Sequence, residues 1–236
     1  MGNREKPATR RDGLPSAVPL TSAFSPVRTD MFKLYYAPGT CALASHIALE
    51  EAGAAYTTER IDFKSNQQNS AEYLAVNPKG RVPSLVTDRG ILTETPAMLV
   101  FIAQSFPQAK LAPLGDAFAF AHAQAFNSYL CSTVHVAHAH KMRGARWATE
   151  EPSFADMKRK VPQTVGASFA LIERDMLKGP WVMGEQYTIC DPYLFTLAGW
   201  LEGDSVDLAA LPKVADHRKR MSERPAVRKV LADEKS

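Results

Sequence analysis

The segment with the clearest chemical potential is a short apolar strand that runs through a Pro-Gly turn into Cys41. Backbone amides at a helix N-terminus, together with its positive dipole end, favour a thiolate over a thiol, so a cysteine placed there can be acidified. The same amides can instead hold a thiolate that a ligand brings. The segment therefore predicts either a cysteine nucleophile or a binding site for another thiol. The alternative is a half-buried cysteine that behaves as a small hydrophobic residue.

The elements that must position this cysteine alternate between strand-like and helix-like patterns after residue 31, in the order βαβ and then ββα. Strands are predicted at 32–37, 55–62, 82–87 and 91–93, and helices at 41–51, 71–76 and 95–104. Thr95 is the expected N-cap of the last helix, with Pro96 in its first turn. This order is typical of a thioredoxin-like fold, a mixed sheet whose first strand delivers a thiol to a helix start.

Redox proteins of that fold carry a second cysteine three positions after the first, and here Ala44 occupies that position. Without a resolving thiol, Cys41 can form a mixed disulfide but cannot expel it by itself. The sequence therefore argues against a dithiol oxidoreductase. An external small thiol such as glutathione would have to complete a cycle.

Several segments of the chain resemble the bacterial beta-class glutathione transferases. The matching stretches are 33–41 (KLYYAPGTC), 45–49 (SHIAL), 77–83 (NPKGRVP), 92–97 (LTETPA), 188–194 (TICDPYL) and 224–227 (RPAV). In the family, the third and fourth of these contact glutathione, the fifth caps a helix and the last lies in the closing helix. The resemblance covers the chain from Met31 to the C-terminus and implies glutathione as the co-substrate.

The two glutathione-contacting segments also have a physical interpretation. A cis bond between Val82 and Pro83 would turn the Val82 backbone outward to pair with an extended peptide, whereas a trans proline would merely open a strand. Glu94 and Thr95 stand where a strand enters a helix, so helix-start amides can meet a carboxylate while Glu94 meets an ammonium. The γ-glutamyl end of glutathione offers both groups. Arg81 either pairs with another carboxylate of the tripeptide or is simply solvated.

The resemblance places His135 at the family's active-site histidine, facing Cys41 across the cleft between two domains, and Tyr36 at its tyrosine position. We predict Cys41 as the principal catalytic residue, His135 as a positioning or proton-transfer partner, and Tyr36 as secondary. The alternative for Tyr36 is a core position on the strand. Two neighbours depart from the family pattern, Ala42 in place of a serine and Val136 in place of a lysine. These changes remove a hydroxyl donor and a cation from the site.

A histidine cluster invites a metal-site interpretation, because His135 and His138 share one helix face at i, i+3 spacing. His140 points elsewhere, and no acidic residue completes a recognised zinc spacing. We therefore predict no metal site.

The chain is predicted to contain a thioredoxin-like α/β domain followed by an all-α domain. Residues 1–30 are expected to be a disordered extension, 31–108 the glutathione-binding domain, 109–115 a linker and 116–236 the helical domain. Helices are expected at 116–141, 153–177 and 188–201, with shorter ones from 211 and 225. Because the first strand begins directly after Met31, one hypothesis makes that methionine the true translation start.

The amino-acid composition argues against a nucleic-acid-binding protein, a membrane-spanning protein and a disulfide-stabilised protein. A net charge of +3 spread along 236 residues argues against a nucleic-acid surface, which needs clustered Lys and Arg. No stretch is long and apolar enough to span a membrane. The three cysteines are too few and too far apart for a disulfide framework, so the reducing cytoplasm is the expected location.

We therefore predict a cytoplasmic glutathione transferase that joins a bound glutathione thiolate to small hydrophobic electrophiles in the cleft of the helical domain. One alternative is glutathione-dependent monothiol disulfide exchange, in which Cys41 forms a mixed disulfide as in glutaredoxin-like enzymes. Another is a non-catalytic binding or scaffold protein that has kept the fold. The resemblance also implies a homodimer, with the Ala- and Phe-rich helix at 116–129 as a candidate interface.

Overall fold

The computed structural model describes Gly2 and residues 32–235. The predictions of a disordered extension over residues 1–30 and of a start at Met31 lie outside the described residues.

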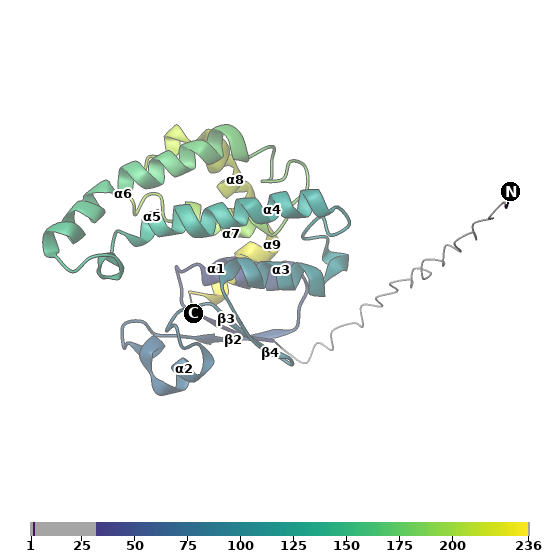
Figure 1. The fold of residues 1–236 in the computed structure, drawn as a ribbon, viewed down its shortest axis with the longest axis horizontal. Helices are drawn as coiled ribbons and strands as arrows, with labels where there is room; N and C mark the ends of the chain where they lie inside the picture. Colours follow the sequence, from purple (N-terminus) through teal and green to yellow (C-terminus); the bar gives the residue numbers. More distant parts are fainter. Residues whose placement is uncertain (1, 3–31, 236) are drawn as a thin grey trace.

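A four-stranded mixed sheet forms the base of the first half of the chain (Figure 1). Its strands are β1 (Phe32–Tyr36), β2 (Tyr56–Arg60), β3 (Ser84–Thr87) and β4 (Gly90–Thr93), in the spatial order β2-β1-β3-β4. β1 pairs in parallel with β2 and antiparallel with β3, and β3 pairs antiparallel with β4. The βαβ-ββα order and the thioredoxin-like fold predicted from the sequence are therefore confirmed.

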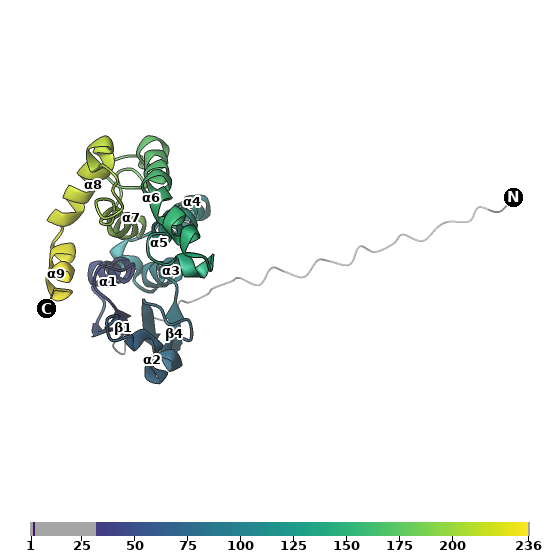
Figure 2. The ribbon, with the colours of Figure 1, turned by 90° about the vertical axis from the view of Figure 1, so that its left-hand side faces the viewer.

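Helices cover both faces of this sheet. α1 (Ala42–Glu51) and α3 (Thr95–Ser105) lie between the sheet and the later helices, whereas α2 (Ala71–Val76) lies on the opposite face (Figures 1 and 2). Side chains along β1 alternate between the two faces of the sheet. Phe32 therefore contacts the ring of Phe101 on α3, whereas Tyr35 contacts the ring of Tyr73 on α2. α1 also packs against helices of the second half, which explains why Ala42 through Leu49 are all buried.

The start of β3 and the N-cap of α3 differ from the sequence-based expectation. β3 begins at Ser84 rather than at residue 82, because Pro83 has no amide to donate to the ladder. The N-cap of α3 is Glu94 and not Thr95, so the Thr95 prediction is wrong. The chain turns one residue earlier than expected, at Glu94 with φ 73°, and Thr95 is already helical and buried.

The second half is built from helices that stack on α1 and α3 (Figure 2). They are α4 (Ala117–Tyr129), α5 (His135–Ala139), α6 (Glu151–Leu171), α7 (Cys190–Ala198), α8 (Pro212–Glu223) and α9 (Pro225–Asp233). α7 lies at the centre, buried on every side by α1, α4 and α8. Within the described part of the chain, no helix has the length and apolar character needed to cross a membrane.

The helix predicted over 116–141 is not continuous. A π-helical segment, η3 (Leu130–Val134), separates α4 from α5, and the His135 amide donates to the Leu130 carbonyl five residues earlier. A π turn holds more residues than an α turn, so it changes the direction in which the following side chains point. His135 is the first residue after this segment, and its direction therefore depends on η3.

Asp191, at the start of α7, ties together three parts of the helical half. It is 0% exposed, and its carboxylate accepts the amides of Val182 at 2.8 Å and Thr188 at 2.7 Å. Nε2 of the buried His217 on α8 lies 3.0 Å from the same carboxylate. The Thr188 hydroxyl in turn accepts the amide of Cys190 at 3.3 Å. The capping motif read from the sequence thus also joins the α8 helix.

Replacing Asp191 with alanine is expected to lower the free energy of unfolding by about 3 kcal/mol or more, because two buried amides and His217 lose their acceptor together. Urea denaturation measures the loss. Asp207→Ala is the matched control, since that exposed aspartate caps only the Ala209 amide and should cost about 1 kcal/mol. If both variants lost the same free energy of unfolding, the hydrogen bonds of Asp191 would contribute no more than an exposed helix cap.

Candidate active site

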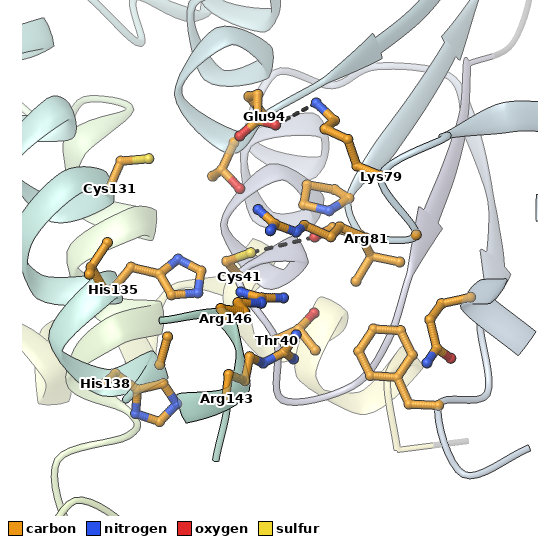
Figure 3. A pocket seen from close by; sticks show the side chains of 18 of the residues that line it. Thr40, Cys41, Lys79, Arg81, Glu94, Cys131, His135, His138, Arg143 and Arg146 are labelled. Carbon is orange, nitrogen blue, oxygen red and sulfur yellow. Dashed lines mark hydrogen bonds and ion pairs between the residues drawn. The ribbon is translucent and has the colours of Figure 1, made fainter. Parts of the chain in front are cut away.

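A cavity of about 1140 Å³ lies between the two halves of the chain. The sheet half contributes the turn at Gly39–Cys41, the segment around Val82 and the start of α3. The helical half contributes side chains from η3, from α5 and from the loop after it. From that half the lining includes Cys131, His135, His138, Met142, Arg143, Arg146, Trp147, Tyr193 and Trp200. Figure 3 shows the two walls facing each other across Cys41.

Cys41 occupies the N-cap position of α1 and is half-buried. Its Sγ donates to the Val82 carbonyl across 3.6 Å, and the Val82–Pro83 bond is cis, as one of the two sequence interpretations required. The neighbouring Thr40 hydroxyl donates to the Ala37 carbonyl at 2.7 Å and accepts the Ala42 amide at 3.3 Å. The first amide of α1 is therefore satisfied by Thr40 and not by the sulfur.

The start of α1 does not acidify Cys41. Burial raises the pKa of the Cys41 thiol to about 11, although a hydrogen bond with Thr95 acts in the opposite direction. Desolvation of a thiolate outweighs the helix dipole here, partly because Thr40 occupies the Ala42 amide. Cys41 is consequently a thiol near neutral pH and acts as a hydrogen-bond donor.

The start of α3 forms the second part of the site. Glu94 has a positive φ of 73°, a conformation that a non-glycine residue adopts at a cost of order 1–3 kcal/mol. Its carboxylate is 2.5 Å from Nζ of Lys79, which also donates to the Thr93 hydroxyl at 2.7 Å. The side chain of Glu94 does not cap α3. Its first amides thus remain available to an anion, as in other helix N-termini.

His135 faces the cavity from the helical wall (Figure 3). Its ring packs edge-on against Trp200 with 5.2 Å between centroids. Burial is the main cause that lowers the pKa of His135 to about 4, and the nearby charges of His138, Arg143, Arg146 and Arg81 contribute in the same direction. The imidazole is therefore neutral near pH 7.

Trp200 links the helical wall to the turn that precedes Cys41. Its indole N–H donates to the Gly39 carbonyl at 3.0 Å. The His138 ring stacks on the indole at 4.2 Å, and His138 Nδ1 lies 2.6 Å from the buried Asp204 carboxylate. This chain of contacts holds the turn before Cys41 against the second half of the protein.

Three guanidinium groups share the cavity, those of Arg81, Arg143 and Arg146 (Figure 3). Among the described residues, none of the three has an ion-pair or side-chain hydrogen-bond partner. Burial lowers the pKa of Arg146, and the nearby positive charges of Arg143 and Arg81 lower it further. The cavity is therefore strongly positive and suited to anionic ligands.

Most residues predicted for the site lie together in this cavity. They are Cys41, Arg81, Val82, Pro83, Glu94, Thr95 and His135. Tyr36 is not among the lining residues, and this departs from the prediction. It is 7% exposed, and its ring packs against His46 of α1 at 5.6 Å. Its place on β1 directs it to the buried face beneath α1, so it has the core position that was its alternative interpretation.

The histidine cluster does not converge on one point. His138 bonds to Asp204, while His140 stacks on Trp147 at 4.2 Å. Within residues 32–235, no group of three His, Cys, Asp or Glu side chains is arranged to hold a metal ion.

Sequence reasoning missed Arg143, Arg146 and Trp200. The two arginines lie three residues apart just after α5, around the short helix η4 (Gly144–Arg146), where a basic pair usually means a solvated turn. Trp200 carries no motif, and it meets the cavity only because α7 ends beside the Gly39 turn. The unusual density of arginine and histidine over residues 135–146 was the one available signal.

Comparison with known proteins identifies the family. Residues 31–104 match the model of the glutathione S-transferase N-terminal domain. Glutathione S-transferase GstA of Escherichia coli O157:H7 is 34% identical over 205 residues, which cover 86% of this chain and 98% of that protein. A crystal structure of a glutathione transferase homologue from Sulfitobacter, with bound glutathione, shares 46% identity at a TM-score of 0.84 and covers 86% of this chain and 98% of its own.

A beta-class glutathione S-transferase of Sphingomonas chungbukensis is also similar, with 31% identity, a TM-score of 0.75 and coverage of 86% of this chain and 98% of its own. The fold and the site thus define a protein of the bacterial glutathione transferase type, as the sequence resemblance implied. The chain belongs to the glutathione S-transferase family of enzymes.

The raised pKa of Cys41 predicts a specific pH profile for its alkylation. In the native protein, the rate of modification by iodoacetamide should keep rising through pH 9, because the thiolate fraction grows about tenfold per pH unit below the pKa. Mass spectrometry of the Cys41 peptide measures the rate. The control is the same peptide in the urea-unfolded protein, where a free thiol titrates near about 8.5. A native profile that levels off below pH 8 would contradict the assignment.

Proposed function

We propose that this protein conjugates the thiol of glutathione to small electrophiles in the cavity between its two halves. The observation that carries the proposal is the meeting of Cys41, the Val82 backbone and the uncapped start of α3 in one positively charged cavity. Glutathione bound to the Sulfitobacter homologue at 46% identity supports the same assignment of the co-substrate.

Each end of glutathione has a matching group in the cavity. The α-carboxylate of the γ-glutamyl residue suits the amides at the start of α3, and its ammonium suits Glu94, in place of the present Lys79 partner. The cysteinyl backbone pairs with the Val82 backbone at the sheet edge. Arg81 lies on the same wall and takes the glycyl carboxylate.

The nucleophile in this proposal is the sulfur of glutathione, not that of Cys41. Because Cys41 remains protonated, its S–H donates a hydrogen bond to the glutathione thiolate, while the guanidinium groups stabilise the negative charge. The thiol proton leaves to solvent. The sulfur lone pair then forms a bond to the electrophilic carbon, and the leaving group departs with its bonding electrons.

His135 serves as a neutral positioning residue on the opposite wall. With a pKa of about 4 it is a weak base, which disfavours the proton-transfer role considered from the sequence. Its contact with Trp200 instead couples the helical wall to the turn before Cys41.

Glutathione-dependent monothiol exchange remains the second candidate. It needs Cys41 as a thiolate that attacks a disulfide, and the raised pKa makes that species rare near neutral pH. A non-catalytic binding protein is the third candidate. The intact set of glutathione-directed groups argues against it.

We also propose that the protein forms a homodimer, and a measurement of its mass in solution tests this. Phe118 on α4 is 84% exposed, which supports pairing of that helix with a second copy. The domain limits 31–108 and 116–236, with a linker at 109–115, and the cytoplasmic location likewise remain predictions.

Two substitutions at Cys41 separate these candidates. Cys41→Ser keeps an O–H donor and should retain conjugation of 1-chloro-2,4-dinitrobenzene within about threefold in kcat/KM, whereas Cys41→Ala should lose about tenfold or more. Both variants should lose any reduction of a glutathionylated peptide, which needs the sulfur. Cys131→Ser, which changes another half-buried cavity thiol, is the matched control and should stay near the wild-type rate.

Calorimetry of glutathione binding accompanies these assays. A wild-type protein that does not bind glutathione would overturn the proposed function in favour of the scaffold class. Equal loss of conjugation in Cys41→Ser and Cys41→Ala would show that the cysteine sulfur itself reacts. Full activity in Cys41→Ala would remove Cys41 from the mechanism.

A further inference from the structure

The charges that line the cavity exceed what glutathione alone would neutralise. Lys79, Arg81, Arg143 and Arg146 bring four cations, and Glu94 is the single carboxylate among the lining residues. Lys79 and Glu94 pair with each other. Glutathione carries two carboxylates and one ammonium, so its thiolate form has two net negative charges. A positive charge therefore remains unmatched after the co-substrate is bound.

The two walls divide these guanidinium groups. Arg81 belongs to the sheet half, beside Val82, on the wall that the proposed function assigns to glutathione. Arg143 and Arg146 belong to the helical half, around η4. In Figure 3 both are drawn beside Thr40 and Cys41. This is where an electrophile must lie to meet the glutathione sulfur.

Large apolar side chains adjoin the two arginines. Trp147 follows Arg146 directly, is 45% exposed and stacks on His140 with 4.2 Å between ring centroids. Met142 precedes Arg143 and is 79% exposed. Both line the cavity. A rigid indole face and a flexible thioether beside two cations suit a flat apolar ring that carries a negative group.

We infer that the electrophile used by this enzyme is an aromatic anion, whose carboxylate or sulfonate is bound by Arg143 and Arg146 while its ring rests against Trp147 and Met142. The inference rests on the proposed function and names its substrate class. The bond changes are those of the proposed reaction: the glutathione sulfur bonds to the ring carbon, and a halide leaves with the bonding electrons. The anionic group takes no part in the bond changes and serves only for binding.

A matched pair of electrophiles tests this substrate class. The probes are 4-chloro-3,5-dinitrobenzoate and the uncharged 1-chloro-2,4-dinitrobenzene, with glutathione saturating. Each kcat/KM is divided by the rate constant of the uncatalysed reaction with glutathione at the same pH. The wild-type enzyme should accelerate the benzoate reaction at least about tenfold more than the neutral one.

Substitutions of Arg143 and Arg146 test whether these side chains cause the preference for the anionic electrophile. Arg143→Gln and Arg146→Gln should each lower the benzoate-to-neutral ratio, and the double variant should lower it by about tenfold or more. Arg89→Gln is the matched control, because Arg89 is an exposed arginine of the β3–β4 turn that does not line the cavity. Its ratio should equal that of the wild type.

Other outcomes overturn the inference. A wild-type ratio near one, or a ratio unchanged in the double variant, would show that the arginines do not select the electrophile. Equal loss for both probes together with weaker glutathione binding by calorimetry would assign the arginines to glutathione instead.

Failure of the proposed function is recognised separately, as absence of glutathione binding to the wild type. In that case, titration of the wild type and the double variant with unreactive 3,5-dinitrobenzoate and 1,3-dinitrobenzene still tests the site. Selective binding of the benzoate that is lost in the double variant would retain the aryl-anion site. Equal binding of the two compounds would reject it.

Discussion

Unpaired positive charge gathered around one cavity is the constraint from which the chemistry of this protein follows. The guanidinium groups of Arg81, Arg143 and Arg146 share one space without a carboxylate partner among the described residues. Like charges that line the same cavity repel each other, and an anionic ligand relieves that repulsion. Burial keeps His135 neutral, and the field of the arginines acts in the same direction. The same field stabilises a thiolate that a substrate brings. The cavity is thus prepared for a negative sulfur that it does not itself supply.

The fold holds the two walls of the cavity opposite each other. The sheet half presents backbone groups at Val82 and at the uncapped α3 start, which suit a peptide ligand. The helical half presents charged and aromatic side chains, directed by the π segment before His135 and by the Trp200 bond to Gly39. Peptide recognition and electrophile recognition are consequently separated onto different halves of the chain. The second wall can then vary its side chains without disturbing the first.

Sequence patterns predicted the parts of the site that depend on local chemistry. The Pro-Gly turn before Cys41 and the helix start after Glu94 were each visible as short motifs, whereas the cis form of the Val82–Pro83 bond was one of two open interpretations. The ionisation of Cys41 was not visible in the sequence, because it depends on burial in the folded chain and on Thr40 accepting the first amide of α1. The π-helical segment η3 could not be predicted either, because its residues have an ordinary helical composition. Burial by residues distant in the sequence and the direction of side chains after a π turn both depend on tertiary packing, so a local sequence pattern does not reveal them.

The central claim is that the protein, through its positive cavity, converts bound glutathione to the thiolate while Cys41 stays protonated. The direct measurement is the ultraviolet absorbance of the thiolate in the complex of Cys41→Ser with glutathione, as a function of pH, with the S-methylglutathione complex as the blank. We expect the bound thiol to titrate at least about one pH unit below the value of about 8.5 of a free thiol. A bound thiol that titrates at or above that value would contradict it.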